Sequence, residues 1–211
     1  MRDPLSKKIK EIKPSGIRRF FDVANTMENV ISLGVGEPDF DTPWHVREEG
    51  IYSLEKGRTF YTSNAGLYPL REEVSRYLNR RFALQYHPDE ILITVGGSEA
   101  IDLAFRAMLD PGDEVIIPDP SYHSYEAQAN SVGAVPVRVP LREENGFQLD
   151  PKELERYITM RTKAIVLNYP SNPIGAVLKR EDAEKLAEVI LKYDLFVISD
   201  EVYEKLVFDG R

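Results

Sequence analysis

The stretch LFVISDEVY, from Leu195 to Tyr203, decides the fold because it joins a buried strand to a polar end. Four apolar residues come first, the sequence turns polar at Ser199, and two acids and a tyrosine follow. A carboxylate at the end of a buried strand costs free energy unless a cation or a set of donors meets it. Asp200 therefore predicts either a bound partner at this strand end or a helix start that the acid caps.

Similar apolar runs alternate with helical patterns from Pro43 onward. Strands are predicted at 91–95, 114–118, 134–139, 163–168 and 195–199. Helices are predicted at 44–56, 67–82, 98–109, 121–131, 151–158 and 179–192. Strands rich in Ile, Val and Leu that alternate with helices are typical of a mostly parallel sheet covered on both faces. The sequence therefore predicts a three-layer α/β fold whose ligands bind outside the carboxyl ends of the strands.

The first forty-two residues do not follow this alternation. They hold two short amphipathic helix candidates around a Pro-Ser-Gly break, and then the strand and turn of VISLGVGEPDF. We interpret 1–42 as an N-terminal arm and small-domain segment, and 43–211 as a large domain.

The composition of the 211 residues is that of an ordinary globular protein, with 42% hydrophobic and 29% charged residues. A net charge of −8 argues against nucleic acid or anionic lipid as the main partner. The chain has no cysteine, no signal-peptide pattern and no apolar run of ~18 residues, so we expect a cytoplasmic protein that binds no membrane. His45, His87 and His123 lack ligand spacing, and no metal site is predicted.

Four strand ends carry the candidate site residues. The first is TVGGSEA, residues 94–100, where two glycines precede Ser98 and Glu99. Glycines allow close approach of a ligand, and the N-terminus of a helix favours an anion such as phosphate. The alternative is a tight turn in which Ser98 caps the helix.

The second and third strand ends are IPDPSYHSYE, residues 117–126, and IVLNYPSNPIGAV, residues 165–177. Tyr122, expected in the first turn of a helix, could stack on a flat ring, or Tyr122 and Tyr125 could simply pack against the sheet. Two X-Pro steps predict an extended path after Asn168 that points Asn172 into the crevice as a donor. The alternative for Asn172 is an ordinary turn start.

The fourth strand end is the opening stretch, with Asp200 and Tyr203. A protonated ring nitrogen would satisfy the Asp200 carboxylate and would be held protonated by it. Pyridoxal 5′-phosphate needs all four features: an anion cradle, a ring stack, a donor to its phenolic oxygen and an acid at its pyridine nitrogen.

The chain resembles the class I/II aminotransferases of the aspartate aminotransferase type, which are fold-type I enzymes that use pyridoxal phosphate. The resemblance rests on LGVGEPDF, FYTSNAGLYPLREEVSRYL, TVGGSEA, YPSNPIGAV and SDEVYEKLVFDG, and covers essentially the whole chain. It implies transfer of an amino group between an amino acid and a 2-oxo acid.

The resemblance also implies roles for single residues. Asp200 resembles the acid at the pyridine nitrogen, Asn172 and Tyr203 the pair at the phenolic oxygen, and Tyr122 the stacked aromatic. The segment of Gly97, Ser98 and Glu99 resembles the family's backbone segment under the phosphate.

Four further positions follow from the same resemblance. Tyr61 is similar to the tyrosine that reaches the phosphate of the neighbouring subunit, which implies a homodimer with composite active sites. Gly36 resembles the backbone contact to the substrate carboxylate, and Ile17 and Arg18 border the side-chain pocket. Arg18 is either a contact to a distal substrate carboxylate or a surface charge.

Two departures from the family pattern stand out. Ile174 replaces the usual threonine of Asn-Pro-Thr-Gly. More importantly, no Ser-x-Ser-Lys motif with the lysine that bonds to the cofactor occurs, and the arginine that grips the substrate carboxylate is also missing. Lys205 is interpreted as a surface residue. We therefore expect a large domain truncated at its C-terminus, with no catalytic residue in this chain and no activity on its own.

Three functional readings follow from these residues. The first is an aminotransferase whose substrate could be aspartate, an aromatic amino acid or acetyl-diaminopimelate. The second is a carbon–sulfur lyase or synthase on the same scaffold, because the cofactor frame is shared. The third is a non-catalytic fragment or an aminotransferase-like sensor domain, although no helix-turn-helix precedes the fold.

Overall fold

The computed structural model describes residues 3–6, 9–10, 23, 26–27, 30–31, 36 and 40–208. The chain divides into two compact units, one of Ser15–Thr94 and one of Met1–Pro14 with Val95–Arg211. Each unit is described by itself. The predicted boundary between 1–42 and 43–211 stays a prediction.

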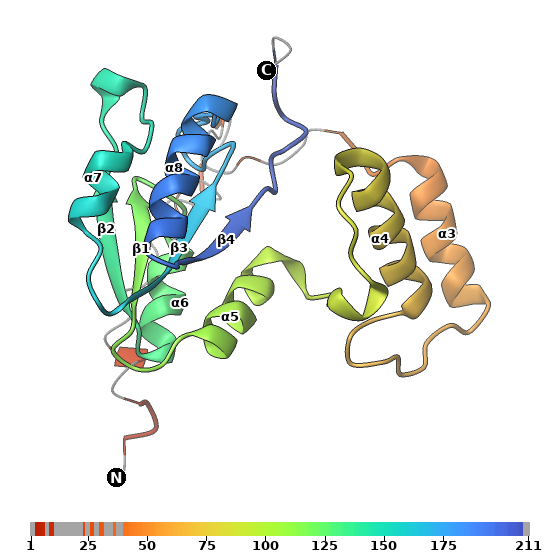
Figure 1. The fold of residues 1–211 in the computed structure, drawn as a ribbon. Helices are drawn as coiled ribbons and strands as arrows, with labels where there is room; N and C mark the ends of the chain where they lie inside the picture. Colours follow the sequence, from red (N-terminus) through yellow and green to blue (C-terminus); the bar gives the residue numbers. More distant parts are fainter. Residues whose placement is uncertain are drawn as a thin grey trace. The chain divides into compact units, whose positions relative to one another are not determined.

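The Ser15–Thr94 unit is built from helices in its described part. They are α3 (Trp44–Glu55), α4 (Tyr68–Phe82) and the short 3₁₀ helix η1 (Pro88–Glu90) (Figure 1). Arg71 of α4 is buried, and its Nη1 donates to the Pro88 carbonyl at 2.9 Å and to the Asp89 carboxylate at 3.2 Å. This guanidinium ties α4 to η1, because its charged donor binds both a backbone carbonyl and a carboxylate of the short helix.

The predicted strand at 91–95 is wrong for the part of the chain that the structure describes. Ile91 has an extended backbone, but residues 91–94 belong to no strand. Ile93 donates its N–H to the Ala65 carbonyl at 3.1 Å and packs against Gly66, where a Cβ would lie 2.6 Å from the Ile93 side chain. Leu92 and Val95 are exposed, so the apolar run is neither buried nor paired, and a strand needs a neighbour to pair with.

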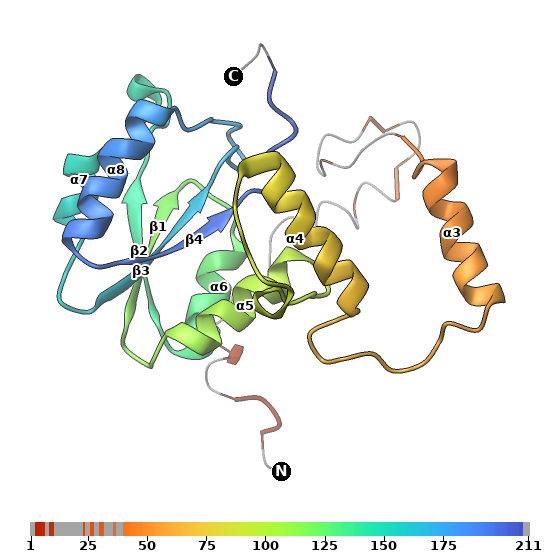
Figure 2. The ribbon, with the colours of Figure 1, turned by 45° about the vertical axis from the view of Figure 1, so that its right-hand side comes forward.

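The second unit contains a parallel sheet. Its strands are β1 (Glu114–Asp119), β2 (Val135–Pro140), β3 (Thr162–Asn168) and β4 (Phe196–Asp200), in the order β2-β1-β3-β4. Its helices are α5 (Gly96–Met108), α6 (Ser124–Val132), α7 (Pro151–Arg156) and α8 (Arg180–Lys192), with the 3₁₀ helix η2 (Glu143–Asn145). All adjacent strands pair in parallel, and the arrows in Figure 2 point the same way.

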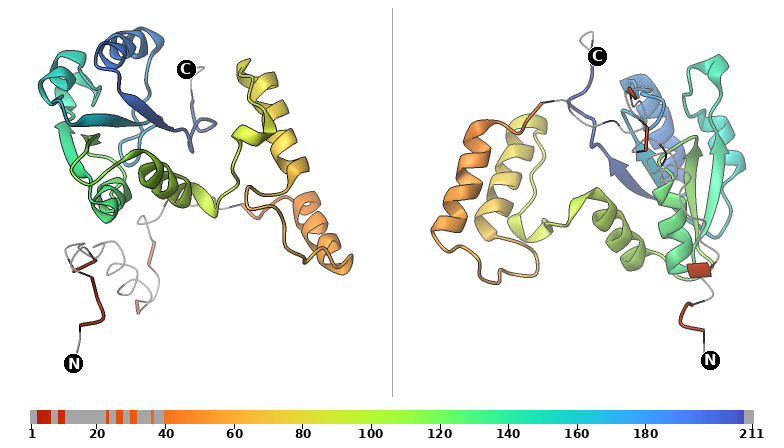
Figure 3. Two further views of the ribbon diagram at one scale, coloured as in Figure 1. Left: turned by 60° about the horizontal axis from the view of Figure 1, so that its bottom comes forward. Right: turned by 180° about the vertical axis from the view of Figure 1, so that it is seen from behind.

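Helices cover both faces of this sheet. Phe105 of α5 and Tyr125 of α6 pack with Val166 on one face, and Leu154 of α7 and Leu186 of α8 pack on the other. Figure 3 shows the green α5 and α6 on one side of the sheet and the teal and blue α7 and α8 on the other. The predicted three-layer α/β fold is confirmed.

The chain reverses its direction of travel across the sheet between β1 and β3. From β1 it passes through α6 to β2 on one side, and from β3 it passes through α8 to β4 on the other. Since α6 and α8 lie on opposite faces, both crossovers can keep the usual right hand. The carboxyl ends of β1 and β3 therefore flank a switch point, where ligands bind in folds of this kind.

The six predicted helices are all present, and two of their starts are shifted by more than one residue. α5 begins at Gly96 rather than residue 98, and α6 begins at Ser124 rather than residue 121. Where the sequence offers a clear cap, the start is as predicted: the Asp150 side chain accepts the Lys152 N–H at 2.9 Å ahead of α7.

Among the described residues, no helix is long and apolar enough to cross a membrane. No group of three or more His, Cys, Asp or Glu side chains there could hold a metal ion.

Candidate active site

The Asp200 carboxylate at the end of β4 receives a hydrogen bond from Tyr125. The Tyr125 hydroxyl donates to Oδ2 at 2.7 Å, and the Val202 N–H donates to Oδ1 at 3.2 Å. Residues 202–205 form a turn rather than a helix, so Asp200 is not a helix cap. An ionised carboxylate offers about four acceptor positions, and these two donors therefore leave room for another partner.

Tyr125 was expected at most to pack against the sheet, and its contact with Asp200 was missed. The side chain is 1% exposed, and it reaches Asp200 from α6 across 75 positions of sequence. Burial raises the pKa of the Tyr125 hydroxyl, and the hydrogen bond to Asp200 raises this pKa further. The hydroxyl therefore stays protonated and acts as a donor to the carboxylate over the ordinary pH range.

Tyr122 and Tyr203 lie around the same pair. The Tyr122 ring is half-buried and meets the Tyr125 ring edge-on, with centroids 5.4 Å apart at 82°. Tyr122 precedes α6 by two residues, so the expectation that it lies in the first helical turn is wrong. Tyr203 is half-buried in the turn after β4, near enough to Tyr125 to contribute to its raised pKa.

Asn168, the last residue of β3, links Asp200 to Asn172. Its Nδ2 donates to the Asp200 carbonyl at 3.0 Å, and its Oδ1 accepts the Asn172 N–H at 2.8 Å. Asn168 is buried, whereas Asn172 is half-buried and therefore keeps some access to solvent. The structure thus brings Asn172, Asp200, Tyr122 and Tyr203 to one end of the sheet, through two residues that the sequence reading did not single out.

The loop after β3 is a tight turn, so the predicted extended path is wrong. The Gly175 N–H donates to the Ser171 carbonyl at 2.7 Å, and the Ser171 N–H donates to the Ala176 carbonyl at 2.9 Å. Gly175 has φ of 76°, a conformation that glycine adopts without steric cost. Two backbone hydrogen bonds across the turn replace the extended conformation and fix the path on both sides of Asn172.

The start of α5 holds the predicted anion segment of Gly97, Ser98 and Glu99. A Cβ built on Gly97 would meet nothing within 4 Å, so the backbone there is open. The helix begins after Val95, and the Glu99 carboxylate accepts the Val95 N–H. The alternative in which Ser98 caps the helix is therefore wrong. The Ser98 carbonyl accepts a hydrogen bond from the Gln128 side-chain amide at 2.9 Å.

The remaining predicted residues lie elsewhere in the chain. Tyr61 belongs to the Ser15–Thr94 unit and is fully exposed, at 107% of its reference area. Gly36 is exposed, and a Cβ there would meet nothing within 4 Å. Ile17 and Arg18 lie outside the described residues. Lys205 is exposed, as a surface residue would be.

A cavity of about 670 Å³ lies on the opposite face of the sheet from Asp200. Its lining includes Leu167, Ser199 and Arg180. Leu167 and Ser199 are register partners one position before Asn168 and Asp200, and successive strand residues point to opposite faces. This cavity is therefore separate from the cluster around Asp200.

The chemistry of the Asp200 cluster fits a pyridine cofactor with an anionic arm. It combines an acceptor with open positions, a neighbouring aromatic ring and an amide residue, and the same unit holds an open helix N-terminus. The described residues thus offer groups that fit the ring and the phosphate of pyridoxal phosphate, whereas the 211 residues hold no motif for the lysine that bonds to it.

Comparisons with known proteins agree with this chemistry. Residues 28–211 match the family "Aminotransferase class I and II", whose members use pyridoxal phosphate. An aspartate aminotransferase of Pyrococcus horikoshii is 45% identical over 97% of this chain and 52% of its own length. Aromatic-amino-acid aminotransferase 2 of Thermococcus litoralis is 43% identical over 98% of this chain and 53% of its own length.

A solved structure gives the same picture. The aspartate aminotransferase from Thermus thermophilus with maleate superposes with a TM-score of 0.94 at 40% identity, over 100% of this chain and 56% of that one. The chain spans about half the length of the curated relatives that it matches. Because the family match covers most of the 211 residues, the chain belongs to the class I and II aminotransferase family.

Proposed function

We propose that this chain supplies the cofactor-binding half of a pyridoxal-phosphate-dependent aminotransferase, which moves an amino group between an amino acid and a 2-oxo acid. The observation that carries the proposal is the Asp200 carboxylate, held by Tyr125 at 2.7 Å with acceptor positions left open. Both neighbours by sequence in the comparisons above are named as aminotransferases.

In this proposal Asp200 keeps the pyridine nitrogen protonated. Its negative charge stabilises the ring proton, and the Tyr125 hydroxyl holds the carboxylate in one orientation. When bound, pyridoxal phosphate supplies the electron sink for the bond changes at the substrate α-carbon. The residues of this chain are proposed to bind and orient the cofactor and to hold the proton on its ring nitrogen.

The other proposed contacts complete the cofactor frame. Asn172 and Tyr203 donate to the phenolic oxygen, Tyr122 stacks on the ring, and the segment of Gly97, Ser98 and Glu99 holds the phosphate. Support comes from the hydrogen bond that fixes the Asn172 backbone and from the open space at Gly97. The dipole of the thirteen-residue α5 favours an anion at its N-terminus.

Homodimerisation with composite sites is part of the same proposal. Tyr61 is fully exposed, as expected of a side chain that contacts the phosphate bound by a partner subunit. Gly36, Ile17 and Arg18 are proposed to face the substrate, and the substrate itself stays open between dicarboxylic and aromatic amino acids. The lysine that bonds to the cofactor has no counterpart motif in the 211 residues.

The test is a turnover assay on the protein as its organism makes it. Glutamate formation from 2-oxoglutarate and a donor amino acid is expected. Release of pyruvate and ammonia without any 2-oxo acid would instead favour the carbon–sulfur lyase on the same scaffold. Repeating the assay with Asp200→Asn separates cofactor-dependent turnover from a contaminating activity.

A further inference from the structure

One buried amide side chain, that of Asn168, contacts two residues of the proposed cofactor site, Asp200 and Asn172. Asn168 is 7% exposed and makes two hydrogen bonds, to the Asp200 carbonyl at 3.0 Å and from the Asn172 N–H at 2.8 Å. Asp200 lies on the adjacent strand, and Asn172 lies in the loop that follows Asn168 itself. The two residues it contacts are those proposed for two polar positions of the cofactor, its ring nitrogen and its phenolic oxygen.

A loop cap alone does not account for this arrangement. Capping the turn requires only an acceptor for the Asn172 N–H, which a serine or an aspartate could also provide. The Asn168 amide in addition donates to its register partner Asp200, at the position where the β3–β4 ladder ends. A strand-end carbonyl would otherwise depend on water, so this donor fixes the direction in which the Asp200 backbone leaves the sheet.

We propose that Asn168 is a positioning residue that holds Asp200 and Asn172 at a fixed spacing, so that one side chain sets both polar contacts to the pyridine ring. The inference rests on the function proposed above. Asn168 touches neither the cofactor nor the substrate in this account and acts only through its two neighbours. Tyr125 differs from it, because the Tyr125 hydroxyl contacts the Asp200 carboxylate and has no hydrogen bond to Asn172 among those of the described residues.

The experiment compares three ligands that need no lysine to bind. The ligands are pyridoxamine 5′-phosphate, its analogue with carbon in place of the ring nitrogen, and its analogue without the phenolic oxygen. Calorimetry gives a dissociation constant for each ligand. The ring-nitrogen preference is the ratio of the dissociation constant of the carbon analogue to that of pyridoxamine 5′-phosphate. The phenolic-oxygen preference is the corresponding ratio for the analogue without that oxygen. A residue that only stabilises the fold would weaken all three ligands alike and leave both preferences unchanged.

Four proteins besides the wild type complete the design. They are Asn168→Ala, Asn168→Asp, Tyr125→Phe and the control Asn145→Ala, which removes an amide bonded to the Gln148 carbonyl at 3.0 Å far from the site in sequence. In Asn168→Ala both preferences should fall roughly five- to tenfold, the effect of one lost hydrogen bond to each of the two residues. In Tyr125→Phe only the ring-nitrogen preference should fall, and Asn145→Ala should change neither.

Asn168→Asp keeps an acceptor for the Asn172 N–H but loses the donor to Asp200. It should retain the phenolic-oxygen preference and lose the ring-nitrogen preference, and its isosteric shape protects the test if Asn168→Ala does not fold. Unchanged preferences in both Asn168 variants would overturn this inference and leave the proposed function standing. Equal or absent binding of all three ligands to the wild type would overturn the proposed function itself.

Discussion

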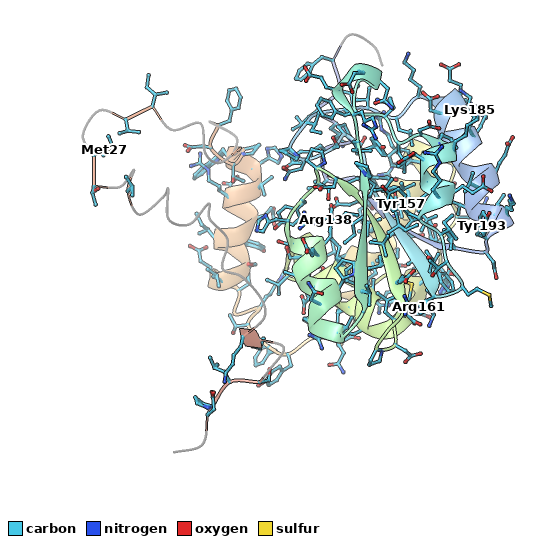
Figure 4. All side chains as sticks on the ribbon, turned by 90° about the vertical axis from the view of Figure 1, so that its left-hand side faces the viewer. Met27, Arg138, Tyr157, Arg161, Lys185 and Tyr193 are labelled. Atoms are coloured by element: carbon cyan, nitrogen blue, oxygen red, sulfur yellow. The ribbon has the colours of Figure 1, made fainter. Side chains whose placement is uncertain are left out.

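Two acidic side chains lie at opposite ends of the same parallel sheet, and they are satisfied in different ways. Glu114 opens β1, and its buried carboxylate accepts from the hydroxyls of Thr159 and Thr162 at 2.6 and 3.1 Å. Arg161, labelled in Figure 4, adds Nε at 3.1 Å and Nη2 at 2.7 Å. Four donors thus occupy this carboxylate, about the number that it can accept.

Asp200 closes β4 and receives far less. Its carboxylate has the Tyr125 hydroxyl and the Val202 N–H among the donors of the described residues, and no cation. An acid at a strand end therefore does not by itself mark a functional site. Glu114 is a structural acid whose acceptor positions are filled, whereas Asp200 keeps acceptor positions over, in keeping with the ligand proposed for it.

The pKa of Glu114 agrees with this distinction. Burial by itself would raise the pKa of Glu114, but hydrogen bonds from Thr159, Arg161 and Thr162 outweigh it, and the pKa lies below its ordinary value. Glu114 is therefore ionised at neutral pH and its charge contributes to the stability of the fold.

The largest expected effect is on the structural acid. Glu114→Ala should lower the free energy of unfolding by about 3 kcal/mol, because two threonine hydroxyls and a guanidinium lose their acceptor. Urea denaturation of the wild type and the variant measures this difference. As a matched control, Glu184→Ala removes an exposed partner of Arg180 and should cost less than about 0.5 kcal/mol. Equal costs for the two variants would contradict the assignment.

The next effect concerns the open acid. Asp200→Asn should weaken pyridoxamine 5′-phosphate roughly 10- to 100-fold, the loss of one charge-assisted hydrogen bond to the ring nitrogen. Its free energy of unfolding should change by less than about 1 kcal/mol, since few donors depend on this carboxylate. Calorimetric titration gives the affinity. If Glu114→Ala, once folded, weakened the ligand as much as Asp200→Asn does, the contrast between the two acids would fail.

Tyr125→Phe should have a smaller effect on stability. Loss of its buried hydrogen bond to Asp200 should cost about 1 kcal/mol in urea denaturation. Tyr193 (Figure 4) offers a matched control, because its hydroxyl donates to the Glu155 carboxylate at 2.8 Å in an exposed setting. Tyr193→Phe should cost less than about 0.5 kcal/mol. If Tyr125→Phe lowers the free energy of unfolding no more than Tyr193→Phe does, the buried hydrogen bond adds no more stability than the exposed one.

The smallest effect is the pH dependence that Glu114 adds. Because its folded pKa is lowered, its contribution is fully present above the ordinary glutamate pKa of 4.5 and is lost as pH falls through the folded value. Denaturation from about pH 7 to about pH 3 should therefore show the gap between wild type and Glu114→Gln closing on the acid side. A gap that is constant over this range would contradict the lowered pKa.

The sequence carries most of the information on the sheet. Runs such as Glu114–Pro118 and Lys163–Asn168 hold several apolar residues in a row, and they correspond to β1 and β3. The run 91–95 has the same pattern but is not a strand, since pairing depends on a neighbour that local sequence does not encode. Helix starts were shifted where no strong capping residue marks them, as at Gly96 and Ser124.

The candidate site was only partly accessible to sequence reasoning. Asp200, Asn172 and Tyr203 follow strand ends, and local pattern finds such positions. Tyr125 and Asn168 were missed because their hydrogen bonds to Asp200 span 75 and 32 positions. The available signal was weak: a tyrosine near the start of a helix, and a polar residue at the end of an otherwise apolar strand.

Asp200 is proposed to pair with a protonated pyridine nitrogen. The most direct measurement is the nitrogen-15 NMR spectrum of ring-labelled pyridoxamine 5′-phosphate bound to the protein, recorded at a pH where the free ligand has lost its ring proton. The account predicts a protonated ring nitrogen in the wild type and an unprotonated one in Asp200→Asn. A bound ring nitrogen with the same protonation state in both proteins would contradict it.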